Sequence, residues 1–382
     1  MARRCTSCAN RHRHPKAASR ASHHLDQQDP PRKQHPPTSP TKSAGSGHTD
    51  TPGRFNMLSL ESSYAALRET AGVYSRGTDV IAIRGAERAE LASKLMAKSI
   101  EFVSSNTCVD SLVLNADGSV AGTVLVIHTD DDYIVVVDAD AAWIDSAREV
   151  AAEFDAELVS TGQRAIAVEG PRSWEVVDPF FGDEDIADLL LNEANEIDHD
   201  GVTGIIARVG TTAEFGYLLI TDATNALDRI RTEAESVDGG EIDPAVLGRV
   251  RAETNFPVLP EQAADATVLE AGIAWLISME RDDEFVGSSV LEVAAPVRRT
   301  VAALIDGDCP AAGTDVFDGE TKVGRVQVAT ERAGQETGLA LLLLDDPYGV
   351  PGLELTVDGR TARTVSRPCI APKSWATQIG VR

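Results

Sequence analysis

The pattern of apolar residues changes near Pro296, and this change limits the folds that the chain can adopt. Before it, apolar runs of strand length alternate with segments of helical spacing, as in residues 79–96, where a strand leads through Gly85 into a helix. After it, strands are separated by Gly, Asp and Pro turns, which is typical of a small closed β-barrel. The sequence therefore predicts an α+β body over residues 57–292 and a C-terminal β-barrel over residues 296–382.

A segment of different composition precedes this body. Residues 1–56 hold ten of the 35 basic residues and three of the 60 acidic ones, and they have no aromatic residue before Phe55. Such a segment cannot bury enough apolar surface to order itself, and it lacks the apolar stretch of a secretory leader. We expect a disordered basic tail or an over-extended gene start, with Met57 as the true first residue.

The cysteines do not predict a metal centre. Cys5 and Cys8 precede His12 and His14, but the gap between the second cysteine and the first histidine is far shorter than the spacing of a zinc finger. The body holds three more cysteines, an odd number without metal-ligand spacing, namely Cys108, Cys309 and Cys369. This usage favours a reduced, cytoplasmic compartment.

The charge of the body limits its partners. From Met57 onward, 57 acidic residues oppose 25 basic ones, and the acids are scattered through the segments instead of clustering. This pattern is typical of a halophilic protein in molar salt, where a Debye length of about 3 Å screens the mutual repulsion. It argues against nucleic acid as a partner. No apolar run approaches the roughly 18 residues of a membrane span, so a membrane partner is not expected either.

Residues 114–137, "LNADGSVAGTVLVIHTDDDYIVVV", predict a hairpin of two apolar strands with a turn at residues 129–132. Its first strand carries two uncharged residues at its centre, Gly122 and Thr123, although the surrounding chain is acidic. If Ile127 pairs with Tyr133, the same register places Asp138 opposite Gly122, on the same face of the sheet. We expect His128, beside the turn, to be a turn-flanking polar residue.

Six segments, in order, resemble the aminomethyltransferase family, which comprises the T-protein of glycine cleavage and its folate-binding relatives. They cover residues 79–95, 114–139, 208–220, 250–254, 282–292 and 303–326. The resemblance implies a T-protein-like folate-binding body of ferredoxin-like α/β units around a central opening, followed by a β-barrel. It also implies that tetrahydrofolate attacks an aminomethyl carbon presented by a lipoyl carrier protein. In that family one carboxylate orients the attacking amine, another grips the pterin, and arginines hold the glutamyl tail.

This chain departs from the family pattern at the residues that carry the chemistry. The acidic pair of the family falls on Gly122 and Thr123, and the carboxylate that grips the pterin falls on Leu218, whereas Glu214 in the same segment is kept. The two tail-binding arginines fall near Leu247 and Ala371. The loss of these groups implies altered chemistry.

The hairpin register offers a compensation, in which Asp138 replaces the lost catalytic carboxylate and Gly122 leaves room for it. The resemblance and the neighbouring residues then imply folate contacts at Thr123, Tyr133, Glu214, Tyr217, Arg249 and Arg251. Arg249 and Arg251 stand two residues apart on a predicted helix and point in different directions, so at most one of them is expected to reach an anionic tail.

Two functions follow from this interpretation. The first is tetrahydrofolate-dependent transfer of an aminomethyl or methyl group, with Asp138 as the substitute carboxylate. The second is a non-catalytic folate-binding or scaffold protein, as among the relatives that assist iron–sulfur assembly. Those relatives carry a "KGCYxGQE" signature that this sequence lacks. The sequence leaves open whether the protein is an enzyme.

Overall fold

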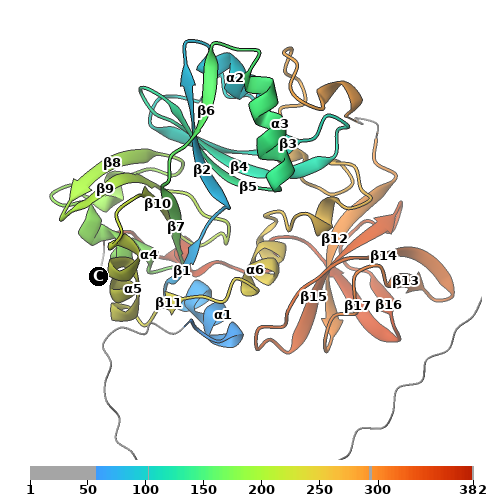
Figure 1. Cartoon of the computed structure of the whole chain (residues 1–382). Helices are drawn as coiled ribbons and strands as arrows, with labels where there is room; N and C mark the ends of the chain where they lie inside the picture. The colour runs from blue at the N-terminus through green and yellow to red at the C-terminus, as the bar shows by residue number, and fades with distance from the viewer. Residues whose placement is uncertain (1–56, 102, 292–294, 381–382) are drawn as a thin grey trace, which may run out of the picture. The chain divides into compact units, whose positions relative to one another are not determined.

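The computed structural model describes residues 57–101, 103–291 and 295–380. The predicted basic tail and the cysteines and histidines of residues 5–14 lie outside this part of the chain. In the described part, one antiparallel sheet and one mixed sheet form the body with their helices, and a closed six-stranded barrel follows them (Figure 1). The predicted α+β body with a C-terminal barrel is thereby confirmed.

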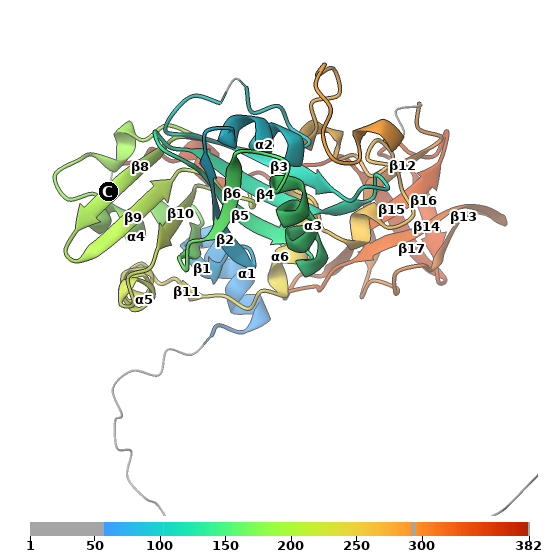
Figure 2. The same ribbon diagram turned by 45° about the horizontal axis from the view of Figure 1, so that its top comes forward.

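The first body sheet has the strand order β3-β4-β5-β2-β6. Two helices cover its outer face, because apolar side chains of alternate strand residues pack against Trp143 and Ala147 of one helix and Leu91 of the other. The elements are β2 (Asp79–Gly85), α2 (Arg88–Leu95), β3 (Thr107–Leu114), β4 (Val120–His128), β5 (Tyr133–Ala139), α3 (Ala141–Ala151) and β6 (Ala156–Ser160). Figure 2 shows α2 and α3 lying over this sheet.

The second body sheet has the order β11-β1-β7-β10-β9-β8. Its outer face packs against two helices through Trp174 and Ile230, which lie in one cluster with Val168 and Leu219 of the strands. The elements are β1 (Gly72–Ser75), β7 (Arg164–Glu169), α4 (Ser173–Val177), β8 (Ala194–His199), β9 (Val202–Ala207), β10 (Gly216–Thr221), α5 (Ala226–Ser236) and β11 (Gly240–Glu241).

A third apolar cluster joins the inner faces of the two sheets. Leu125 and Ile134 of the first sheet share it with Leu218 and Ile220 of the second. Helices α1 (Leu60–Glu69) and α6 (Val246–Thr254) complete it. Each large aliphatic side chain buried in this way contributes about 1.5–3 kcal/mol. Apolar side chains of both sheets therefore share one core.

The barrel has the strand order β12-β15-β14-β13-β16-β17 and closes by pairing β12 with β17. Its bounds are β12 (Arg298–Asp306), β13 (Asp315–Asp318), β14 (Thr321–Ala329), β15 (Thr337–Asp345), β16 (Glu354–Val357) and β17 (Arg360–Val365). Leu339 and Leu341 on its outer side pack with Ala252 of α6, which fixes the barrel against the body.

The residues after the barrel return to the body. Cys369 donates its backbone N–H to the carbonyl of Glu253, at 2.9 Å, and Ile379 packs against the cluster of the second sheet. The red segment in Figure 1 follows this path. The boundary that the sequence suggests at residue 296 remains a prediction, and the structure adds that residues 366–380 contact the body.

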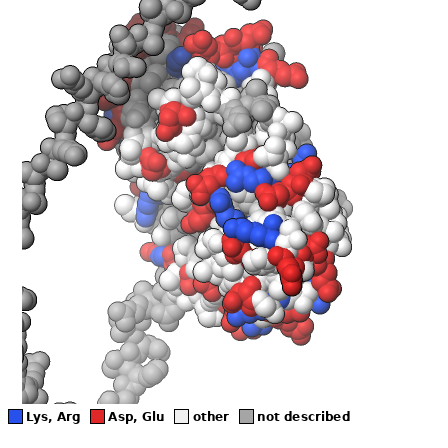
Figure 3. Space-filling view, turned by 90° about the vertical axis from the view of Figure 1, so that its right-hand side faces the viewer, with Lys and Arg blue, Asp and Glu red and all other residues white. Residues whose placement is uncertain are grey.

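Figure 3 shows Asp and Glu side chains over much of the barrel face, with Lys and Arg between them. Exposed ion pairs connect them, among them Lys322 with Asp315 at 2.7 Å and Arg363 with Asp306 at 3.4 Å. Among the described residues, no helix has the length and apolar character needed to cross a membrane.

Candidate functional site

A cavity of about 330 Å³ lies where strands β4 and β5 run toward the end of α6. Its wall takes residues from the hairpin, from α6 and from the segment after α6: Val120, Ala121, Gly122, Thr123, Asp138, Ala139, Asp140, Arg251, Phe256, Pro257, Leu259 and Pro260. Three of the residues singled out from the sequence, Thr123, Asp138 and Arg251, thus share one cavity. Its volume falls at the small end of the range for ligand pockets, roughly 300–1,000 Å³.

The hairpin register differs by one residue from the predicted register. Asp138 stands opposite Thr123, and Ala139 stands opposite Gly122. The turn explains the difference: Thr129 donates its N–H to the carbonyl of Asp132, so His128 pairs with Tyr133 and Ile127 pairs with Ile134. The predicted pairings of Ile127 with Tyr133 and of Gly122 with Asp138 are wrong.

Gly122 has a backbone role. A Cβ atom at this position would lie 2.4 Å from the carbonyl oxygen of Asp138 and 2.5 Å from the Cα of Ala139. The ladder between β3 and β4 also shifts register beside it, at Val113 and Leu114. The expectation that Gly122 makes room for a carboxylate is therefore wrong, because the space is taken by the backbone of β5.

Asp138 and Arg251 are the oppositely charged side chains that face each other across the cavity. Arg251 Nη1 lies 3.9 Å from Asp138 Oδ2, which is an ion-pair distance but too long for a hydrogen bond. The Arg251 side chain is 16% exposed, its Nε has no hydrogen-bond partner in the described part of the chain, and its guanidinium lies over the ring of Phe256. The Asp138 side chain is 45% exposed and open to the cavity.

Asp140 also lines the cavity, but its carboxylate is already engaged. It caps helix α3 by accepting a hydrogen bond from the N–H of Trp143, at 2.8 Å. An N-cap of this kind typically stabilises a helix by about 1 kcal/mol. One oxygen of Asp140 is thus engaged in the cap, and Asp138 is the carboxylate that pairs with Arg251.

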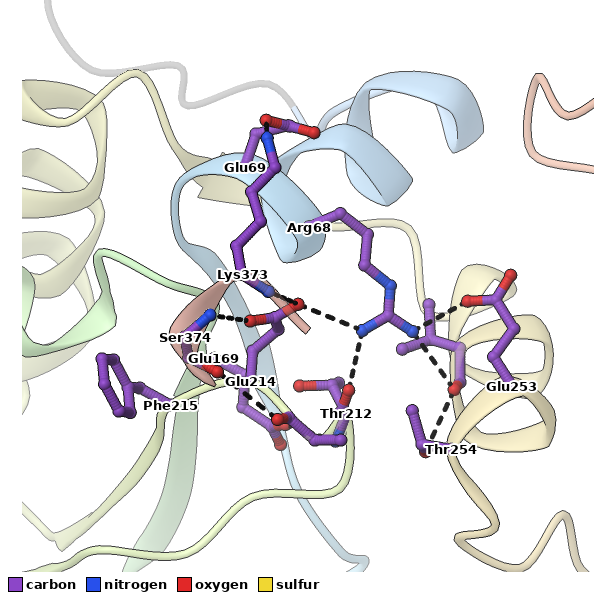
Figure 4. A network of polar contacts seen from close by, with 12 residues as sticks. Arg68, Glu69, Glu169, Thr212, Glu214, Phe215, Glu253, Thr254, Lys373 and Ser374 are labelled. Atoms are coloured by element: carbon purple, nitrogen blue, oxygen red, sulfur yellow. Dashed lines mark hydrogen bonds and ion pairs between the residues drawn. The ribbon is translucent and has the colours of Figure 1, made fainter. Parts of the chain in front are cut away.

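Glu214 lies in a buried polar network away from this cavity (Figure 4). Its carboxylate accepts the backbone N–H groups of Lys373, at 3.2 Å, and Ser374, at 2.9 Å, and it lies 3.7 Å from Arg68 Nη1. Arg68 also donates to the carbonyl of Thr212 at 2.7 Å. Glu214 thus holds the C-terminal segment to the body.

Arg249 is engaged in the same network, and it points away from Arg251 as the helical spacing predicts. Its Nε donates to Glu253 Oε1 at 2.8 Å, and its Nη1 donates to the carbonyl of Thr337 in β15 at 2.9 Å. Glu253 accepts a second guanidinium, that of Arg68, at 2.8 Å. These contacts connect α6 to the barrel and to α1. Removal of one partner from a buried ion pair costs about 3–5 kcal/mol, so we assign Arg249 a structural role.

The two tyrosines that the sequence proposes as folate contacts do not lie at the cavity. Tyr133 is on the outer face of β5, where its ring stacks on that of His128 with centroids 4.6 Å apart. Tyr217 points into the cluster under α4 and α5. Leu218 faces the core between the sheets, as a buried apolar residue at this position should.

Sequence reasoning missed a buried carboxylate, Glu169, at the end of β7. It accepts hydrogen bonds from the Tyr74 hydroxyl, at 2.5 Å, and from the N–H groups of Thr211 and Thr212, at 2.8 and 2.9 Å. Burial and this carboxylate raise the pKa of Tyr74, so its hydroxyl stays protonated and donates. The available signal was a single acid closing the apolar run "RAIAVE". Sequence reasoning also missed Phe256, which lines the cavity beneath the Arg251 guanidinium.

Comparisons with known proteins agree on one protein family. Residues 44–281 match the model of the GCVT N-terminal domain family. An aminomethyltransferase of Anoxybacillus flavithermus is 24% identical over 85% of this chain and 93% of its own length. An aminomethyltransferase of Geobacillus kaustophilus is 26% identical over 83% of this chain and 90% of its own length. A probable aminomethyltransferase of Thermococcus kodakarensis is 24% identical over 83% of this chain and 91% of its own length.

Among solved structures, the glycine cleavage system aminomethyltransferase T of Bartonella henselae is similar with a TM-score of 0.71. It is 19% identical, and the match covers 82% of this chain and 90% of that one. This similarity supports the fold, including the terminal barrel.

Proposed function

Since this chain belongs to the GCVT family of aminomethyltransferase-like, folate-binding proteins, we propose that it transfers a one-carbon unit from an amine donor to tetrahydrofolate. The reaction would be of the aminomethyl or methyl transfer type found in glycine cleavage. A lipoyl carrier protein is the partner that the family resemblance suggests, and the cytoplasm is the expected compartment.

The position of Asp138 carries this proposal. The family resemblance places an acidic pair at Gly122 and Thr123, and Asp138 stands directly across the ladder from Thr123. Its carboxylate opens into the cavity, so it occupies nearly the same space from the neighbouring strand. With the corrected register, the position of Asp138 opposite Thr123 supports it as the substitute carboxylate, without room left by Gly122.

The chain's own groups have defined roles in such a transfer. Bound tetrahydrofolate would supply the N5 electron pair for the bond to the one-carbon unit. The electron pair of the broken bond would leave with the donor, which would take up the proton released from N5. The Asp138 carboxylate stabilises the positive charge that develops on the amine and accepts its proton. Arg251, whose Nη1 lies 3.9 Å from Asp138 Oδ2, attracts that carboxylate and orients it.

The test is Asp138→Asn, with Asp131→Asn in the exposed hairpin turn as the matched control. We expect Asp138→Asn to lower the rate of one-carbon transfer to tetrahydrofolate by about 10²–10⁴-fold, which is the usual contribution of a positioned acid–base group. The Asp131 variant should retain the rate. Equal rates in both variants would remove Asp138 from the mechanism.

A second function, that of a non-catalytic folate-binding or scaffold protein, is favoured by two observations. Leu218, at the position of the pterin-gripping carboxylate, is buried in apolar core, and Arg249 is engaged with Glu253. Tetrahydrofolate at a hundred times its Kd should raise the free energy of unfolding by about 2.7 kcal/mol. Such stabilisation without transfer from any amine donor would support non-catalytic folate binding, whereas no stabilisation would exclude the transfer and favour a scaffold.

A further inference from the structure

The cavity wall presents one positive and one negative side chain that the described protein groups leave incompletely paired. Arg251 Nε is buried without a hydrogen-bond partner in the described residues, and Nη1 lies 3.9 Å from Asp138 Oδ2. Nη1 is beyond hydrogen-bond distance of Asp138 Oδ2, so it can take an acceptor from a ligand, whereas the fully buried Nε cannot. Asp138, open to the same space, accepts donors.

These two groups select among ligand charges. An anion would pair with Arg251 and be repelled by Asp138, whereas a cation would pair with Asp138 and be repelled by Arg251. A molecule that carries both charges, with its carboxylate toward Arg251 and its ammonium toward Asp138, satisfies both groups. Charge-assisted hydrogen bonds of this kind are about twice as strong as neutral ones.

The spacing fits the smallest common zwitterion. In an α-amino acid the nitrogen and the nearer carboxylate oxygen are about 3 Å apart, given the standard bond lengths. Asp138 Oδ2 and Arg251 Nη1 are 3.9 Å apart. The ligand nitrogen can therefore bond to Oδ2 and the ligand oxygen to Nη1, each at roughly 2.7–3.2 Å, without movement of β5 or α6.

Apart from Thr123 and Asp140, the remaining side chains of the wall are apolar. Phe256, Pro257 and Leu259 line it, and Asp140 on its rim is already engaged with the N–H of Trp143. A volume of about 330 Å³ exceeds that of a small amino acid, so it leaves space for an aliphatic side chain or for the reacting edge of a second molecule.

We propose that this cavity binds a free α-amino acid as a zwitterion, with its carboxylate on Arg251 and its nitrogen on Asp138. As an identification of the amine donor, this rests on the proposed function. The proposal of a binding site depends only on the two side chains. It assigns Arg251 to the carboxylate of a small ligand in place of the glutamyl tail of folate.

The first test uses the unmodified full chain without folate. Glycine, N-methylglycine, alanine and leucine are titrated by calorimetry, beside their methyl esters and the matching amine-free acids from acetate upward. We expect at least one amino acid to bind, with its ester and its amine-free acid each at least tenfold weaker. Absence of binding by all four amino acids, or equal affinity of an ester or an amine-free acid, would overturn the proposal.

The second test uses variants of the two side chains. Arg251→Met and Asp138→Asn should each weaken the bound amino acid about ten- to a hundredfold, whereas Arg148→Met and Asp131→Asn, both exposed, should not. Arg251→Met should leave the weak binding of the ester unchanged, since the ester has no carboxylate for Arg251. Unaltered amino-acid affinity in either cavity variant would contradict the assignment.

The two proposals fail separately. Amino-acid binding in the absence of folate, without any transfer to tetrahydrofolate, would leave this site in place and reject the proposed function. Folate-dependent transfer by a protein that binds none of the four amino acids would do the reverse.

Discussion

At the scale of single residues, two buried tyrosines differ in the hydrogen bonding of their hydroxyl groups. The Tyr217 hydroxyl is buried without a hydrogen-bond partner in the described part of the chain, whereas the Tyr74 hydroxyl donates to Glu169. Burial raises the pKa of both phenols, so each hydroxyl stays protonated at neutral pH. The sequence suggested a ligand role for Tyr217, but its surroundings are those of a core residue.

Substitution of both tyrosines by phenylalanine tests this difference. Tyr217→Phe removes an unsatisfied polar atom, so we expect the free energy of unfolding to stay the same or rise by up to about 1 kcal/mol. Tyr74→Phe leaves the buried Glu169 short of a donor and should lower it by about 1.5–3 kcal/mol. Urea unfolding in molar KCl measures both, and a larger loss for Tyr217→Phe than for Tyr74→Phe would contradict the argument.

At the scale of elements, strand parity decides which side chains can act together. Asp138 and Tyr133 are five residues apart in β5, an odd number, so they lie on opposite faces of the sheet. Asp138 faces α6 and the cavity, and Tyr133 faces the helices on the outer side. The alternation was legible in the sequence, and it excludes a shared site for these two side chains without any structure.

The close approach of β4 and β5 predicts a strong effect at Gly122. Gly122→Ala places a methyl group within 2.4 Å of the Asp138 carbonyl oxygen, so the backbone must move, and we expect a loss of about 1–3 kcal/mol in the free energy of unfolding. Gly248→Ala is the control, because a Cβ at this position in α6 meets no atom within 4 Å. It should raise stability by about 0.5–1 kcal/mol. Denaturant unfolding of both variants decides it, and a neutral Gly122→Ala would refute the steric explanation.

At the scale of the whole molecule, one ion pair links the segment before the barrel to its first strand. Arg298 donates from Nε and Nη2 to the carboxylate of Glu270, at 2.9 and 2.7 Å. Hydrogen bonds from this guanidinium hold the pKa of Glu270 below its ordinary value of 4.5. The stabilisation is therefore complete above that value and is lost as the pH falls through the lower value of the folded state.

Glu270→Gln should destabilise the protein at neutral pH and weaken its pH dependence in the acid range below about pH 4.5. The exposed Glu261→Gln is the control and should keep the wild-type dependence. Thermal unfolding followed from neutral pH down to the acid range measures both variants. A wild-type slope in Glu270→Gln would exclude this carboxylate as a source of acid sensitivity.

The net charge of −25 predicts a dependence on salt. Repulsion between like charges destabilises the compact state, and molar salt shortens the Debye length to about 3 Å. We expect the melting temperature to rise steadily as KCl increases from about 0.1 M, where the Debye length is about 10 Å, into the molar range. Equal melting temperatures at both extremes would contradict the halophilic interpretation.

The sequence by itself indicated the alternation of strands and helices in the body, the barrel, and the burial of Leu218, because apolar periodicity and turn residues act over a few positions. It did not determine every element, since residues 183–197, which read as a helix, contain the start of β8. The resemblance added the family. These properties are local, so they survive substitution at the residues that carry the chemistry.

The tertiary structure alone decided which charged groups meet. Arg249 and Arg251 are equivalent in the sequence, yet one joins Glu253 and Thr337, far along the chain, while the other faces Asp138. The hairpin register was likewise set by the geometry of the turn and by the close approach at Gly122. Pairing over long sequence separations depends on how whole elements pack, and a one-residue slip is enough to change every partner.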